Sequence, residues 1–168
     1  MQLKPLDTPE LIKLVADWLA QKENYQWLDF GDGRQLVSPE WLKIATQRGT
    51  QVLRLFTCDD TNRPIGVVGL ANINPHFKTG NLWIVLGEKH SAGRGYASRA
   101  VSQMLTFGFT ELGLSAINTW IVEHNPSVRV AERVRFRPMG RQRQCHYIDG
   151  RAYDRLWFDL LASEHCEI

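Results

Sequence analysis

The sequence predicts one α/β (α+β) domain, residues 1–168, with a mixed, mostly antiparallel sheet flanked by about four helices. Three observations predict this class. Apolar runs at 52–57, 64–73 and 82–86 follow one another through short polar links, as antiparallel strands do. A helical stretch then separates the third run from a fourth, and such a crossover makes a parallel pair in the middle of the sheet. The length suits one domain with a complete core.

Two helices are expected before the first strand. Thr8-Pro9 and Ser38-Pro39 each combine a capping side chain with proline at the first helical position. The first helix has one apolar stripe, and the second runs from Trp41 to Gly49.

Residues 25–33, between these helices, are rich in aromatic residues, Gly and Asp and are predicted to form a loop. Trp27 is a candidate substrate contact there, because recognition concentrates on loops; the alternative is packing beneath the loop. Asp29 and Asp32 would favour a cationic acceptor if they face it, and otherwise face solvent.

The second half of the chain supplies the remaining elements. Residues 117–122 form the strand reached by the crossover, and a short helix begins at Asn125-Pro126-Ser127. Strands at 142–147 and 153–161 form a hairpin around Asp149-Gly150.

A glycine-rich stretch, residues 90–97, lies between the third strand and the helix that follows it. Unpaired backbone N–H groups and the positive end of the helix dipole meet at such a junction, which suits an anion such as a pyrophosphate. Gly93 and Gly95 would let a phosphate approach the main chain. The stretch lacks the Gly-Lys-Ser/Thr of a Walker A loop, and Ser98 stands where a dinucleotide fingerprint needs its third glycine. Glycines that serve packing alone are the alternative.

The composition, 43% hydrophobic and 23% charged, is typical of a globular protein. We expect a cytoplasmic protein, because the sequence has neither the apolar run of a signal peptide nor a stretch of membrane-spanning length. Cys58, Cys145 and Cys166 lack CxxC spacing, which argues against a disulfide framework and against a zinc site. We therefore expect no metal.

Charge is unevenly distributed along the chain. Residues 90–151 hold nine arginines, no lysines and four acidic side chains, an excess of five positive charges. This excess favours a partner with several phosphates, or else marks a solvated basic face. Nucleic acid is the weaker candidate, because the pI of 8.5 is below that of a dedicated basic domain.

Three motifs and the order of the elements resemble the GNAT superfamily of acetyl-CoA-dependent N-acetyltransferases. The motifs are Gly93-x-Gly95-Tyr96-Ala97, the stretch from Pro126-Ser127 to Phe136, and Tyr147-x-x-Gly150-x-x-Tyr153-Asp154. The last two resemble the RimJ/RimL-like branch, which includes ribosomal-protein-alanine acetyltransferases.

The resemblance implies how acetyl-CoA, the co-substrate, is held. The strands at 82–86 and 117–122 would splay apart, with the coenzyme in the gap and its pantetheine arm paired to the backbone at Val85 and Leu86. Its pyrophosphate would take N–H groups from the glycine-rich stretch: Gly93, Arg94, Gly95, Tyr96 and Ala97. Asn125 joins this cofactor-binding set, although the branch places its asparagine at the position of His124.

The resemblance also implies two catalytic residues. Ser127 matches the branch's serine, nine residues before Phe136, which can protonate the departing thiolate; its alternative is a plain helix cap. His146 stands where some members carry a glutamate base, and an imidazole can take a proton near neutral pH. The alternatives are a structural histidine or a proton relay through water. Ala131 replaces the tyrosine acid of many other GNAT enzymes, so a tyrosine route is not expected.

These features predict an N-acetyltransferase that moves an acetyl group to a primary amine by direct attack on the thioester. The acceptor is a protein N-terminus or a small amine. The alternatives are a small-molecule enzyme for an antibiotic, polyamine or amino sugar, and a non-catalytic acyl-CoA-binding module. The expected partners are acetyl-CoA and the acceptor, with a homodimer as the expected assembly and no membrane.

Overall fold

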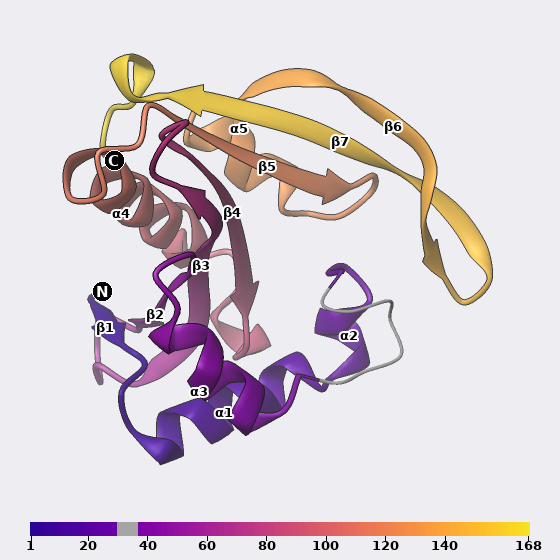
Figure 1. The fold of residues 1–168 in the computed structure, drawn as a ribbon. Helices are drawn as coiled ribbons and strands as arrows, with labels where there is room; N and C mark the ends of the chain where they lie inside the picture. The colour runs from indigo at the N-terminus through magenta and orange to yellow at the C-terminus, as the bar shows by residue number, and fades with distance from the viewer. Residues whose placement is uncertain (30–36) are drawn as a thin grey trace.

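The computed structural model describes residues 1–29 and 37–168, and its centre is one seven-stranded sheet (Figure 1). The strand order is β1-β2-β3-β4-β5-β7-β6, and only β4 and β5 pair in parallel. The predicted mixed sheet with a central parallel pair is therefore confirmed. The strands are β1 (Leu3–Pro5), β2 (Val52–Thr57), β3 (Pro64–Asn74), β4 (Thr79–Leu86), β5 (Ala116–Val122), β6 (Arg137–Ile148) and β7 (Arg151–Leu161).

Five α-helices lie in the described residues: α1 (Pro9–Leu19), α2 (Lys22–Tyr25), α3 (Pro39–Gln47), α4 (Tyr96–Thr110) and α5 (Val128–Arg133). The two predicted cap-plus-proline starts are confirmed. The Thr8 hydroxyl accepts from the Leu11 N–H at 3.4 Å, and the Ser38 hydroxyl accepts from the Trp41 N–H at 3.2 Å. No helix in the described ranges is both long and apolar enough to cross a membrane.

Several boundaries differ from the prediction. The three-residue β1 and the single turn α2 are too short to show a hydrophobic period, so neither was expected. β6 begins at Arg137 rather than at 142, because its first eight residues are exposed and carry no apolar alternation.

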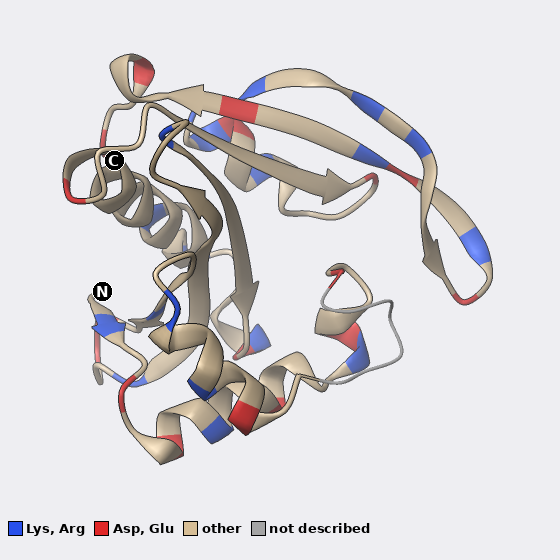
Figure 2. Cartoon of the chain, viewed as in Figure 1, with Lys and Arg blue, Asp and Glu red and all other residues tan. Residues whose placement is uncertain are grey.

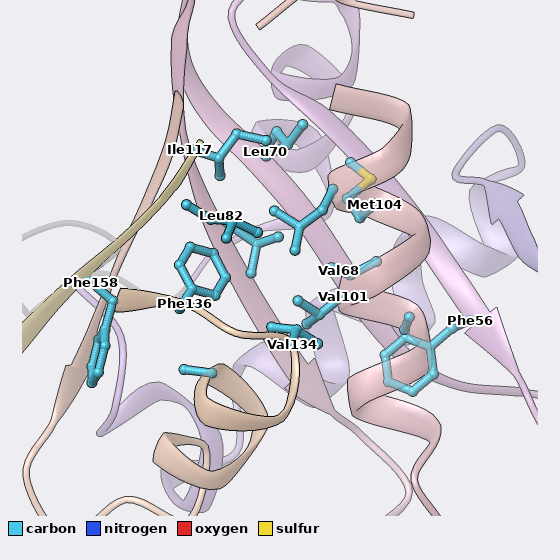
Figure 3. Close-up of a cluster of buried hydrophobic side chains, with 14 of the residues drawn as sticks. Phe56, Val68, Leu70, Leu82, Val101, Met104, Ile117, Val134, Phe136 and Phe158 are labelled. Carbon is cyan, nitrogen blue, oxygen red and sulfur yellow. The ribbon is translucent and has the colours of Figure 1, made fainter. Parts of the chain in front are cut away.

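The core lies on both faces of the sheet. Leu82 of β4 packs with Val101 and Met104 of α4 (Figure 3), and Ile84 packs against the same cluster. Val85, one residue further along β4, lies on the opposite face in a second cluster with α1 and α3. The alternation of a strand therefore buries both faces of β4.

The parallel pair is short. β4 and β5 are paired at only three positions, Thr79↔Ala116, Gly80↔Ile117 and Asn81↔Asn118. Beyond them the strands diverge (Figure 1), while β4 stays paired with β3 and β5 stays paired with β7. The predicted splay is therefore present, and it leaves the facing edges of the two strands without a partner strand.

A substitution at Gly66 tests the close packing of β3 against its two neighbouring strands. A Cβ at this position in β3 would lie 2.2 Å from the Phe56 ring and 2.5 Å from the Val85 carbonyl oxygen. We expect Gly66→Ala to lower the free energy of unfolding by about 1–3 kcal/mol, because the backbone of β4 must move. Gly49→Ala is the control, since nothing lies within 4 Å of its Cβ. Urea unfolding followed by tryptophan fluorescence measures both, and equal stabilities would contradict this packing.

Candidate functional site

The glycine-rich loop presents a row of unpaired amides at the start of α4. Gly93 and Gly95 both have φ of +78°, a left-handed conformation that glycine adopts without strain. Within the described residues, the N–H groups of residues 93–98 have no hydrogen-bond acceptor. Arg99 is the first residue of the helix whose N–H is bonded, to the Gly95 carbonyl at 3.1 Å. The loop can therefore bind an anion through its main chain.

Asp59, in the turn between β2 and β3, holds the end of this loop in place through contacts with the first turn of α4. Its carboxylate accepts two hydrogen bonds from Arg99, at 2.8 and 2.9 Å, and also pairs with the N-terminal ammonium. The Arg99 guanidinium and the ammonium hold the pKa of Asp59 well below its usual range. The Asp59 N–H donates to the hydroxyl of buried Tyr96 at 3.3 Å. The start of α4 is thus anchored to the sheet.

A cavity of about 680 Å³ opens beside this loop, and we call it the loop cavity. It extends from the glycines along the end of β4 to the start of α5. Nine residues named from the sequence line it: Trp27, Val85, Leu86, Gly93, Gly95, Tyr96, Ala97, Asn125 and Ser127. Arg94 is exposed and does not line the cavity.

Three basic residues that the sequence analysis did not single out also line the loop cavity: Lys89, Arg129 and Arg133. The Lys89 ammonium donates to the Leu86 carbonyl at 2.7 Å and to the Asn24 side chain. Partial burial lowers the pKa of Lys89, and nearby Glu23 opposes this shift. Unpaired amides and basic side chains together suit a ligand with several phosphates.

The remaining arginines of residues 90–151 have other roles. Basic residues recur along the β6–β7 hairpin (Figure 2), where Arg137 pairs with Glu164 at 2.7 Å and Arg141 pairs with Asp154 at 2.9 Å. The predicted arginine excess is thus divided between a cavity wall and a solvated face.

A second cavity, of about 330 Å³, lies where β4 and β5 diverge, and we call it the cleft cavity. Its wall is mostly apolar and contains four indole rings: Trp27, Trp41, Trp83 and Trp120. Of these four, only Trp27 was a candidate site residue in the sequence. The other three come from α3, β4 and β5, and no local motif connects them.

Six residues line both cavities: Trp27, Leu28, Ile84, Asn125, Ser127 and Val130. On this shared wall, the Ser127 N–H donates to the Asn125 side chain at 2.8 Å. Ser127 has helical dihedral angles and its hydroxyl caps nothing, so the alternative of a plain helix cap does not hold. The hydroxyl makes no hydrogen bond within the part of the chain that is described, and it stays available to a ligand.

His146 lies outside both cavities, and its contacts do not suit the predicted role of a base. The buried ring donates from Nε2 to the Gln26 carbonyl at 2.7 Å. Its Nδ1 accepts from the Arg155 guanidinium at 3.2 and 3.3 Å. This tautomer follows from the two partners. Neither nitrogen is free to take a proton from an acceptor.

His146 instead belongs to a row of polar contacts that we call the α2–hairpin bridge. The Lys22 ammonium pairs with Asp149 at 2.6 Å, and the Asp29 carboxylate pairs with Arg155 at 3.0 Å. With the Gln26–His146 bond, these contacts tie residues 22–29 to the β6–β7 hairpin. Residues 30–33 of the predicted loop, including Asp32, lie outside the described residues.

Proteins with similar sequences are named N-acetyltransferases. An uncharacterized N-acetyltransferase, p20, from Bacillus licheniformis is 31% identical over 107 residues, which is 63% of this chain and 60% of p20. The putative ribosomal N-acetyltransferase YdaF from Bacillus subtilis (strain 168) is 25% identical over 173 residues, covering 96% of this chain and 90% of YdaF.

Solved structures share the fold. Spermidine N-acetyltransferase from Vibrio cholerae, in complex with CoA and spermine, superposes with a TM-score of 0.82 at 20% identity, covering 97% of this chain and 96% of that one. A probable acetyltransferase superposes with a TM-score of 0.76 at 22% identity, covering 95% and 92%. The acetyltransferase (GNAT) domain family matches residues 1–137 of the sequence. This chain therefore belongs to the GNAT acetyltransferase domain family.

Proposed function

We propose that this protein transfers an acetyl group from acetyl-CoA to a primary amine. The observation that carries the proposal is the shared wall: a cavity suited to phosphates and an apolar cavity meet at the free hydroxyl of Ser127. Membership of the GNAT family supports the same reaction. The coenzyme would occupy the loop cavity, and the amine would occupy the cleft cavity.

Acetyl-CoA matches the chemistry of the loop cavity. Its diphosphate would accept from the unpaired amides that begin at Gly93, and Lys89, Arg129 and Arg133 would balance its charge. Its pantetheine arm would lie against β4 at Val85 and Leu86, beyond the point where β5 diverges. Arg94 would bind the diphosphate through its main-chain N–H group. Asn125 would contact the coenzyme from the shared wall.

The reaction we propose is a direct displacement. The amine nitrogen attacks the thioester carbonyl, a C–N bond forms, and the C–S bond breaks. Ser127 donates its hydroxyl proton to the departing thiolate, and the proton that the attacking nitrogen loses as it becomes an amide is passed through water to restore the Ser127 hydroxyl. The apolar cleft disfavours an ammonium ion, so the amine loses its proton to water before it attacks. His146 acts as a positioning residue, since its bonds hold Gln26, next to Trp27 of the shared wall.

The acceptor is a protein N-terminus or a small amine. The motifs typical of the RimJ/RimL-like branch and the name of YdaF favour a ribosomal-protein N-terminus. The spermidine acetyltransferases among the structural neighbours favour a small molecule. One of those neighbours is dodecameric, and the homodimer expected for this chain stays a prediction.

Coenzyme binding tests the proposal at Gly95. We expect calorimetry to show that CoA binds the wild type, and that Gly95→Ala weakens binding about fivefold or more, because an L side chain disfavours φ of +78°. Gly113→Ala is the matched control: its φ is +64° and nothing lies within 4 Å of its Cβ, but it follows the far end of α4. It should lose stability but not CoA affinity. A wild type that binds no CoA would overturn the proposal.

Replacing Ser127 tests the acid. We expect Ser127→Ala to lower kcat by about 10²-fold or more with CoA affinity nearly intact, because the hydroxyl acts on the thiolate only as the C–S bond breaks. A thiol-release assay with acetyl-CoA and saturating amine measures kcat. An unchanged kcat would remove Ser127 from the mechanism.

Replacing His146 separates a positioning role from a base. We expect His146→Gln to raise the KM for the amine while the dependence of kcat/KM on pH keeps its wild-type shape between about pH 6 and 9. Lys22→Gln breaks another contact of the same bridge and should act in the same direction, more weakly, since its ion pair is exposed. If His146→Gln alone abolished an acidic limb of the profile, the base role would be restored.

A further inference from the structure

We infer that the cleft cavity selects amines with a single charge and an apolar body, because the protein's own Arg155 occupies the place of a second cation. This inference rests on the proposed function and names its class of acceptor. It follows from the wall of the cavity, from the partners of Asp29 and from the position of the Arg155 guanidinium.

The wall of the cleft cavity is apolar over most of its surface. Beside the four indole rings it contains Leu82, Ile84, Ile121 and Phe136. Its polar side chains are neutral except for one, and Thr119 already donates to the Leu82 carbonyl at 2.9 Å. A hydrocarbon or aromatic body would lose water contact here at little cost, whereas a buried charge needs a partner.

Asp29 is the one carboxylate among the described residues of this wall, and it is already paired. Its Oδ2 accepts from the Arg155 Nη1 at 3.0 Å. The same guanidinium lies 3.9 Å from the centroid of the Trp120 ring and donates to His146. The Arg155 side chain is only 16% exposed. Thus an internal cation occupies one oxygen of the half-exposed Asp29 carboxylate and one face of the Trp120 ring, and both would otherwise attract an ammonium group.

The cleft therefore limits the number of charged groups that the acceptor can carry. The reacting amine must be neutral when it attacks, so its own charge needs no partner in the cleft. A polyamine would bring further ammonium groups into an apolar wall, near the fixed charge of Arg155. A monoamine with an aliphatic or aromatic body brings none.

The test compares amines of similar basicity that differ in charge: 2-phenylethylamine and hexylamine against spermidine. Binding to the protein saturated with CoA is followed by tryptophan fluorescence, and turnover is followed by thiol release from acetyl-CoA. We expect each monoamine to bind more tightly than spermidine and to exceed it in kcat/KM by at least tenfold.

Arg155→Met tests the internal cation directly. It frees Asp29 and should raise the affinity for spermidine at least fivefold relative to 2-phenylethylamine. Arg151→Met is the matched control on the same strand, because the Arg151 guanidinium lies over Tyr153, and neither residue is part of the cleft wall. It should leave the preference unchanged.

A second pair of variants covers the case in which Arg155→Met does not fold. Trp41→Ala removes an indole that is 43% exposed and lines the cleft cavity only. It should weaken monoamine binding at least fivefold with CoA affinity unchanged. Ile44→Ala, on the same helix and lining neither cavity, is its control.

The outcomes separate the two proposals. Monoamines that bind preferentially but release no thiol would support this inference and overturn the proposed reaction. Spermidine that binds and reacts as well as the monoamines would overturn the inference and leave the reaction standing. A folded Arg155→Met protein with wild-type preference, or a wild type that binds none of the amines, would also overturn the inference.

Discussion

The structure depends on the early divergence of β4 from β5. After three paired positions, each strand keeps its outer neighbour and loses its inner one. Backbone groups on the two inner edges then need other partners, since an unpaired buried N–H or C=O is costly. The Thr119 hydroxyl supplies one of them at the fork, through its bond to the Leu82 carbonyl. Both cavities lie along the edges beyond this point.

Side chains packed on the two faces of the sheet set the shape of the opening between β4 and β5. Phe136 and Val101 fill it from the α4 side, whereas Trp83 lies on the face that packs against α1. The glycine-rich loop is held independently, through the contacts of Asp59 with Arg99 and with Tyr96. The protein's own contacts therefore hold the amides of the loop in place, and preorganised donors of this kind can bind an anion without a further ordering cost.

Features with local signals were predictable from the sequence. Thr8-Pro9 and Ser38-Pro39 gave two helix starts, and the crossover gave the parallel pair. Contacts between distant residues were not predictable. The Gln26–His146 and Asp29–Arg155 contacts join residues 120 and 126 positions apart.

His146 illustrates what the local sequence does not show. A histidine in a strand has the chemistry of a base, but the sequence does not tell whether its ring nitrogens are occupied. Here a carbonyl from residue 26 and a guanidinium from residue 155 occupy them. The grouping of the four indoles in the cleft could not be predicted either, because each belongs to a different segment and only the fold brings them together.

The α2–hairpin bridge explains how one short segment serves both cavities. Trp27 and Leu28 line the loop cavity and the cleft cavity alike, and they stand between Gln26 and Asp29. Because the hairpin holds these two flanking residues, it fixes the shared wall from outside without contributing its own tip to either cavity. A change in the hairpin contacts is then expected to alter both cavities together. In the proposed reaction, a single piece of the chain would therefore position the amine and the coenzyme against one another.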